Sequence, residues 1–225
     1  MSFYDLPNVG IYLDTFNPFL FQRIKQEVSG FVTKFENARI ADDESRDLLR
    51  LYQKKIQGYS TDYKLTDPLV DAVDKEILKL VHKYESKYRY FDKMFNYSTG
   101  IENLETKIAL ERIWVNMQRA GEFLPMHHHS GLYSFVIWTT IPYTMSDEKD
   151  NTANPDLIKN RTANFEFTYT DALGKISNYP IPVDSSLEGK ICIFPSELQH
   201  QVYPFYSSPG VRVSVAGNYR LEIVK

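Results

Sequence analysis

From about residue 100 onward, the chain consists of short runs of β-branched and aromatic residues separated by Gly, Pro, Asn and Asp. This alternation of apolar runs and turn residues is typical of an all-β domain. It predicts strands at residues 112–118, 132–141, 162–170, 190–194 and 211–219, with a hairpin turn at Asp171–Gly174. The polar stretch from Ser146 to Arg161 is expected to be a mobile surface loop, of the kind that supplies lids.

The first hundred residues carry a helical pattern instead. Asn17-Pro18 predicts an N-cap followed by proline at the first helical position, before a helix of about residues 17–35. The acidic segment Asp42–Leu51 is compatible with a shorter helix. Asp67-Pro68 repeats the start signal before the most strongly indicated helix in the chain. Its apolar stripe contains Leu69, Val73, Ile77, Leu80, Val81, Tyr84 and Tyr88. We therefore expect a helical extension over residues 1–99 and a β domain over residues 100–225.

Composition narrows the possible partners and compartments. At 225 residues the chain is long enough to bury a sizeable core, and its formal charge of −3 argues against bulk nucleic acid as a partner. The one cysteine, Cys192, lies in an apolar run and is expected to be a buried strand residue. With no disulfide partner, no signal-peptide pattern and no membrane-spanning stretch, the chain is expected in the cytoplasm and not in a membrane.

Four of the five histidines belong to one candidate metal site. In an extended segment residues i and i+2 point to the same side, so His127 and His129 can converge while His128 points away. His200, which follows another predicted strand, would complete one face of an octahedral ion and leave the other positions open, as non-heme iron requires. The alternative for the triplet is a polar turn without metal. The fifth histidine, His82, is interpreted as structural.

Two further polar side chains are predicted to lie on inward strand faces. Arg212 alternates with valines, which places its guanidinium on the same face as Ser214. A buried guanidinium needs an anion, and its planar fork suits a carboxylate, either of a bound molecule or of a protein acid. Asn116 shares a face with Trp114 and could either orient a metal-bound group or satisfy backbone groups inside the barrel. Trp114 is interpreted as core or pocket wall.

Six segments, taken in order, form a recognisable set: Trp114–Asn116, Gly121–Gly131, Ser134–Ile137, Gly189–Ser196, His200–Pro204 and Arg212–Asn218. Together they resemble the 2-oxoglutarate- and iron(II)-dependent oxygenase superfamily, in particular small oxygenases of phages and marine bacteria. The resemblance covers about residues 100–222.

The resemblance implies a mainly β (α+β) fold, a double-stranded β-helix of the jelly-roll or cupin-like type, with the N-terminal helices packed on the barrel. It also implies that His127 and His200 hold iron(II) and that Arg212, helped by Ser214, binds the distal carboxylate of 2-oxoglutarate. In the family the remaining ligand is usually an Asp or Glu two residues after the first histidine, and here that position is His129. A three-histidine site lacks one negative charge and occurs in oxygenases that use no 2-oxoglutarate.

The leading hypothesis is an oxidoreductase, a dioxygenase that decarboxylates 2-oxoglutarate and hydroxylates an unactivated C–H bond of a small-molecule or peptide substrate. A cupin-type dioxygenase that keeps the three histidines but binds its substrate directly to the metal is the second. The third is a non-catalytic jelly roll, such as a binding or virion-associated protein. The helices could also mediate a homodimer, and a phage-encoded chain would work in the host cytoplasm.

Overall fold

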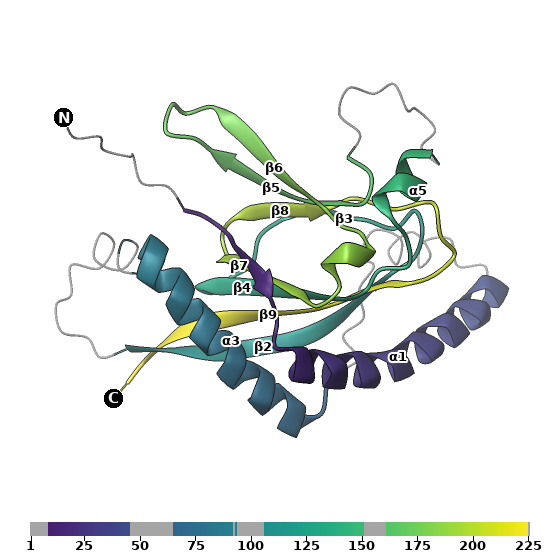
Figure 1. The fold of residues 1–225 in the computed structure, drawn as a ribbon, viewed down its shortest axis with the longest axis horizontal. Helices are drawn as coiled ribbons and strands as arrows, with labels where there is room; N and C mark the ends of the chain where they lie inside the picture. The colour runs from purple at the N-terminus through teal and green to yellow at the C-terminus, as the bar shows by residue number, and fades with distance from the viewer. Residues whose placement is uncertain (1–8, 46–64, 92, 94–105, 151–160, 225) are drawn as a thin grey trace.

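The computed structural model describes residues 9–45, 65–91, 93, 106–150 and 161–224. They form two antiparallel sheets, of strand order β1-β7-β4-β9-β2 and β3-β8-β5-β6, with helices α1 and α3 on the outer face of the first sheet (Figure 1). The strands are β1 (Tyr12–Thr15), β2 (Thr106–Gln118), β3 (Leu124–His127), β4 (Tyr133–Thr140), β5 (Asn164–Thr170), β6 (Ile176–Pro182), β7 (Lys190–Pro195), β8 (Gln199–Val202) and β9 (Arg212–Ile223). The helices are α1 (Pro18–Ser45), α3 (Asp67–Tyr88), α5 (Met145–Asp150) and the 3-10 turn η1 (Ser185–Leu187). The predicted mainly β, jelly-roll fold class is confirmed.

Strand β4, at the centre of the first sheet, is buried on both faces. Phe135 and Ile137 belong to a core that the sheet shares with α1 and α3, whereas Val136 and Trp138 belong to a second core between the two sheets. Successive side chains of a strand point to opposite faces, so one strand serves both cores. The same alternation on β2 and β9 leaves every second side chain facing the space between the sheets.

Helix α1 begins where the sequence predicts it and ends later. The side chain of Asn17 accepts hydrogen bonds from the backbone N–H groups of Phe19 (3.1 Å) and Leu20 (3.2 Å), which makes it the N-cap. The predicted end near residue 35 is wrong, because the helix continues to Ser45. No Gly or Pro lies between residues 31 and 45 to stop it, although the apolar spacing has already faded. Residues 42–45 of the expected shorter helix therefore belong to α1, and the remainder lies outside the described residues.

Helix α3 confirms the stronger helix prediction and is anchored to the sheet by partly buried hydrogen bonds. Its buried residues are Leu69, Val73, Ile77, Val81 and Tyr84. The hydroxyl of Tyr219, on β9, donates to the carboxylate of Asp74 at 2.8 Å, and the hydroxyl of Tyr133, on β4, donates to Glu85. The stripe of α3 thus packs on the barrel rather than on a second copy of the chain.

Replacing Tyr219 with Phe should lower the free energy of unfolding by about 0.5–1.5 kcal/mol, because it removes a partly buried hydrogen bond and leaves the aromatic packing in place. Urea denaturation measures this difference. Tyr206→Phe is the matched control, since Tyr206 is 52% exposed, and it should change stability by less than about 0.5 kcal/mol. An equal effect of the two substitutions would contradict a specific link between β9 and α3.

The five predicted strands are all present, but β2 begins at Thr106 and not at 112, and β9 continues to Ile223 and not to 219. The Asp171–Gly174 turn joins β5 to β6 as expected. The sequence did not predict four strands, β1, β3, β6 and β8. Two of them, β3 and β6, contain proline, which weakens a strand signal. The expected loop from Ser146 is wrong at its start, where α5 forms, and residues 151–160 lie outside the described residues.

The part of the chain before residue 99 contributes a strand as well as helices. Strand β1 pairs with β7 as the edge strand of the first sheet, with Tyr12 opposite Ile193. Cys192 lies beside this pairing and is a free, buried thiol, as predicted, and burial raises its pKa.

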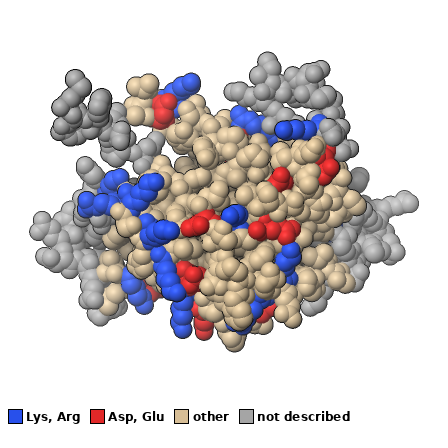
Figure 2. All heavy atoms as spheres, in the orientation of Figure 1, with Lys and Arg blue, Asp and Glu red and all other residues tan. Residues whose placement is uncertain are grey.

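None of the described helices is long and apolar enough to cross a membrane. On the face shown in Figure 2, basic and acidic side chains are interspersed.

Candidate metal centre

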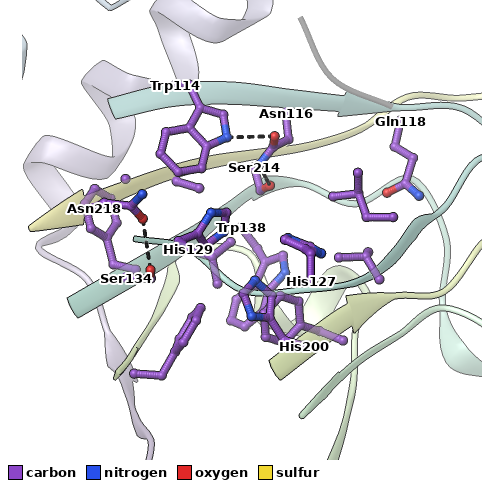
Figure 3. A pocket seen from close by; sticks show the side chains of 18 of the residues that line it. Trp114, Asn116, Gln118, His127, His129, Ser134, Trp138, His200, Ser214 and Asn218 are labelled. Carbon is purple, nitrogen blue, oxygen red and sulfur yellow. Dashed lines mark hydrogen bonds between the residues drawn. The ribbon is translucent and has the colours of Figure 1, made fainter. Parts of the chain in front are cut away.

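A cavity of about 260 Å³ opens between the two sheets. Alternating residues of β2 and β9 in the first sheet, and residues of β3 and β8 in the second, contribute to its lining. Polar and aromatic residues that line the cavity include Arg112, Trp114, Asn116, Gln118, His127, His129, His200, Arg212, Ser214 and Asn218. The predicted site residues therefore line one cavity, and Figure 3 shows the three imidazoles close together there.

Pairing of β3 with β8 explains how two of the histidines meet. His127 lies directly opposite His200 in this antiparallel pair, and their ring centroids are 4.3 Å apart. His129 follows β3, and its ring lies 5.1 Å from each of the other two. One nitrogen of each ring lies within 4.8 Å of those of the other two, a spacing that a single ion can bridge.

The position of His129 beyond the end of β3 is fixed by its backbone. Its N–H donates to the carbonyl of Ser196 (2.9 Å), which ties the segment to the loop between β7 and β8. Gly131 then turns the chain with φ of +112°, and a Cβ there would lie 2.8 Å from the carbonyl oxygen of Tyr219. Only glycine suits this turn, so the Ser-Gly that follows the triplet serves to place His129.

The three imidazoles are held in a form suited to a metal. Nδ1 of His127 lies 2.7 Å from the carbonyl of Pro125, and Nδ1 of His200 lies 2.8 Å from that of Leu198. Since a carbonyl only accepts, both rings carry their proton on Nδ1 and leave Nε2 free to bind an ion. Burial lowers the pKa of His200 to about 3 and that of His129 to about 4, and it also lowers the pKa of His127. The cluster is therefore neutral at ordinary pH.

The other two histidines lie elsewhere. His128 is exposed and its Nδ1 lies 3.1 Å from the side-chain amide of Gln199, so it points away from the cluster as the strand periodicity predicts. His82 is exposed on α3 and does not take part in the cluster.

Arg212 is a buried cation surrounded by neutral groups. Its guanidinium donates to Oε1 of Gln118 from Nε (3.1 Å) and Nη2 (2.6 Å), to the hydroxyl of Tyr143 (2.7 Å) and to the carbonyl of Tyr203 (2.7 Å). It is 4% exposed and forms no ion pair with any described acid. The interpretation as a structural ion pair thus finds no partner in the part of the chain that is described. A buried charge of this kind favours an anion from outside the chain.

Ser214 and Asn116 are joined in a short polar chain along the pocket wall. The indole N–H of Trp114 donates to Oδ1 of Asn116 (3.0 Å), whose Nδ2 donates to the hydroxyl of Ser214 (3.4 Å), as Figure 3 shows. Asn116 therefore forms hydrogen bonds with two side chains, and not with the backbone groups inside the barrel that the sequence also allowed. Trp114 also packs edge-on against His129, with centroids 5.6 Å apart, so it forms pocket wall as expected.

The sequence did not single out three polar residues of the pocket neighbourhood. Gln118 and Tyr143 orient Arg212, while Arg112 lines the end of the cavity beyond Trp114. Asn218 lines the same end, on the face of β9 that the strand periodicity predicts for Arg212 and Ser214. The period-2 pattern that singled out Trp114 and Asn116 extends to Arg112 and Gln118, so continuing it would have found both. No local signal indicates Tyr143, because it reaches Arg212 across the fold.

Residues 112–218, just under half of the chain, match the sequence model of a family described as "Putative 2OG-Fe(II) oxygenase". No curated protein matches the sequence. The predicted resemblance to this superfamily is confirmed over the matched residues.

Among solved structures, a prolyl-4-hydroxylase from Pseudomonas putida is similar, with 15% sequence identity, a TM-score of 0.50, and coverage of 94% of this chain and 92% of that one. This likeness supports the double-stranded β-helix fold and nothing finer. An oxidoreductase of the 2OG-Fe(II) oxygenase family from Burkholderia pseudomallei shares 14% identity with a TM-score of 0.35. That match covers 57% of this chain and 50% of the other, so the chain spans half of that protein's length.

Proposed function

We propose that the chain, whose residues 112–218 match the model of a family described as putative 2OG-Fe(II) oxygenases, binds iron(II) and 2-oxoglutarate and hydroxylates an organic substrate. Iron(II) and 2-oxoglutarate are the cofactor and cosubstrate of that family. The observation that carries the proposal is the arrangement of a neutral histidine cluster and a buried arginine without an acid partner in one cavity.

The donor set fits iron(II). Nitrogen atoms of His127, His129 and His200 lie close enough for one ion, and the Nε2 atoms of His127 and His200 are free of protons. Imidazole is a good ligand for iron, and three ligands on one side leave positions for other molecules. When bound, iron(II) would supply the redox chemistry that couples oxidation of 2-oxoglutarate by dioxygen to oxidation of the substrate.

The residues around Arg212 fit one carboxylate of 2-oxoglutarate. The amide of Gln118 and the hydroxyl of Tyr143 hold the guanidinium in place, so little side-chain freedom is lost when an anion binds. Ser214 lies two residues further along the same face and offers its hydroxyl to the same molecule. Apolar side chains, among them Trp138, Phe165 and Phe194, line the remainder of the cavity and exclude water from it.

A second candidate function is favoured by the identity of the third ligand. Because His129 occupies the position of the usual acid, and no Asp or Glu is among the lining residues in the described part of the chain, the cluster also suits a cupin-type dioxygenase. In that enzyme the substrate would bind the metal directly and Arg212 would bind a substrate carboxylate. The two functions differ in their need for 2-oxoglutarate.

Purified protein supplied with iron(II), ascorbate and 2-oxoglutarate under air should release succinate slowly, and a chelator should abolish the release. Succinate is measured by NMR, with Arg220→Gln as the control, since Arg220 pairs with Glu222 outside the cavity. Oxygen uptake that is independent of 2-oxoglutarate would favour the cupin-type enzyme. Absence of bound iron would instead favour the non-catalytic jelly roll.

Several finer properties are part of the same proposal. The substrate is a small molecule or peptide, because the cavity is too small for a folded macromolecule and bulk nucleic acid does not suit the net charge. Residues 1–99 form an extension that packs on the barrel of residues 100–225. The protein works in the cytoplasm, that of the host if a phage encodes it. A homodimer would use a surface other than the buried stripe of α3.

A further inference from the structure

The cavity has a second polar end, which the proposed iron and 2-oxoglutarate sites do not use. Strands β2 and β9 run the length of the cavity, with Gln118 opposite Arg212 at one end and Arg112 opposite Asn218 at the other. Six residues of extended chain separate Arg112 from Gln118, which corresponds to roughly 20 Å. The two arginines therefore lie at opposite ends, and Arg112 is not the arginine to which the distal carboxylate of 2-oxoglutarate is assigned.

Asn218 presents a buried donor without a partner. The residue is fully buried, and its Oδ1 accepts a hydrogen bond from the hydroxyl of Ser134 at 2.9 Å (Figure 3). The hydroxyl of Ser134 also lies 3.0 Å from that of Ser196. Nδ2 of Asn218 makes no hydrogen bond in the structure, although the residue lines the cavity. An unsatisfied buried N–H destabilises the structure, so the site favours an acceptor from outside.

Arg112 brings a positive charge to the same end. Its guanidinium carbon lies 5.0 Å from the centre of the Trp114 ring, which in turn contacts His129. Within the described part of the chain it forms no ion pair, and the neighbouring acid, Glu111, is exposed and does not line the cavity. The stacking contact holds the planar fork at the mouth of the cavity, where it remains available to a carboxylate.

Charge balance in the cavity also favours a further anion. With three neutral imidazoles, the charge of iron(II) is cancelled by the two carboxylates of 2-oxoglutarate, and the charges of Arg112 and Arg212 remain. No acid among the described lining residues offsets them. A cavity with such an excess of positive charge attracts anions. Replacement of the usual acidic ligand by His129 increases this excess by one charge.

We propose that Arg112 and Asn218 form the subsite that recognises a carboxylate of the primary substrate. The inference rests on the proposed function for the location of the reaction, and it names the substrate class: a small organic acid. The size of the cavity supports this class, because about 260 Å³ lies below the usual range of about 300–1,000 Å³ and must also hold 2-oxoglutarate. Trp114, between the subsite and His129, then sets the side of the substrate that faces the metal cluster.

The test uses the 15N-labelled protein loaded with zinc(II), which is diamagnetic and redox-inert, and saturated with 2-oxoglutarate so that Arg212 is occupied. N-acetylglycine is the probe, and N-acetylglycinamide is its uncharged counterpart. The side-chain amide resonance of Asn218 should shift on addition of the acid and not of the amide. Binding should weaken at least tenfold in Arg112→Gln and in Asn218→Asp, which keeps the contact with Ser134 but replaces the donor by an acceptor.

Arg220→Gln, an exposed arginine on the same strand as Asn218, is the matched control and should bind the probe as the parent chain does. Arg112 is exposed, so its substitution leaves the fold intact even if Asn218→Asp does not. Equal binding of acid and amide, or no effect of Arg112→Gln, would overturn the subsite. Tighter binding of methyl phosphate than of N-acetylglycine would overturn the carboxylate assignment in favour of a phosphate.

The same titration without zinc and 2-oxoglutarate, in the Arg212→Ala background, separates the two proposals. Binding that still depends on Arg112 would support the subsite even if 2-oxoglutarate never binds. Conversely, normal binding of 2-oxoglutarate with no binding of the probe would leave the proposed function standing and overturn the subsite alone.

Discussion

Replacing His200 with Ala is expected to abolish stoichiometric iron(II) binding. His200 is 3% exposed, faces His127 across the β3–β8 pair and has its Nδ1 held by a carbonyl, so it supplies a preorganised nitrogen that no neighbouring side chain replaces. Loss of a residue that only supports a metal ligand typically lowers the metal affinity about 10–100-fold. Loss of the ligand itself should lower the iron(II) affinity further. Anaerobic calorimetry and the metal content after dialysis measure the effect.

His128→Ala is the internal control, because His128 is exposed beside Gln199 and outside the cluster, and it should leave the iron affinity unchanged. His200 packs among Phe165 and Phe194, so its loss also opens a small gap in the core, and circular dichroism should verify the fold. His127→Ala removes a less buried member of the cluster and should show the same loss of iron. Stoichiometric iron in the folded His200→Ala variant would rule out the ligand assignment.

The second large effect is expected from Arg212→Ala, which should weaken 2-oxoglutarate binding by about 1.5–3 kcal/mol, the range of a hydrogen bond to a charged group. This corresponds to roughly 10–150-fold in affinity. Iron(II) should bind almost as before, since Arg212 bonds Gln118, Tyr143 and Tyr203 and is not among the ligands. Calorimetric titration of the metal-loaded variant with 2-oxoglutarate gives the affinity.

Arg212→Lys is the matched variant for this prediction, because it keeps the charge and loses the planar fork, and its effect should be intermediate. Thermal unfolding of both variants shows whether loss of the bonds to Gln118 and Tyr143 disturbs the barrel. Equal weakening of iron and 2-oxoglutarate, or weakening of neither, would contradict the role assigned to Arg212.

The sequence is enough to predict which face of a strand each histidine and Arg212 occupies, because strand periodicity is a local property. The alternation along β9 puts Arg212 and Ser214 on one face and the valines on the other, and its register with β2 is regular over Arg112–Gln118. The same rule separated His128 from its neighbours. Where a strand is long and without bulges, counting by twos is enough to predict what faces the cavity.

The features that the sequence did not predict depend on contacts between segments that are distant in the chain. The pairing of His127 with His200 comes from the four-residue strands β3 and β8, which are too short to leave a periodic signal. Two further features, the orientation of Arg212 by Tyr143 and the Nδ2 of Asn218 without a partner, follow from how β9 meets elements far away in the chain. The edge strand β1 was missed for the same reason, since its strand character comes from pairing with β7.

The most direct test of the central claim is an anaerobic titration of the iron(II)-loaded protein with 2-oxoglutarate, followed by visible spectroscopy. Bidentate binding of 2-oxoglutarate to iron should produce a metal-to-ligand charge-transfer band that saturates at one equivalent and is lost in Arg212→Ala at the same concentration. If iron binds and no band forms, the claim that this chain is a 2-oxoglutarate-dependent oxygenase is contradicted and the three-histidine cupin mechanism takes its place.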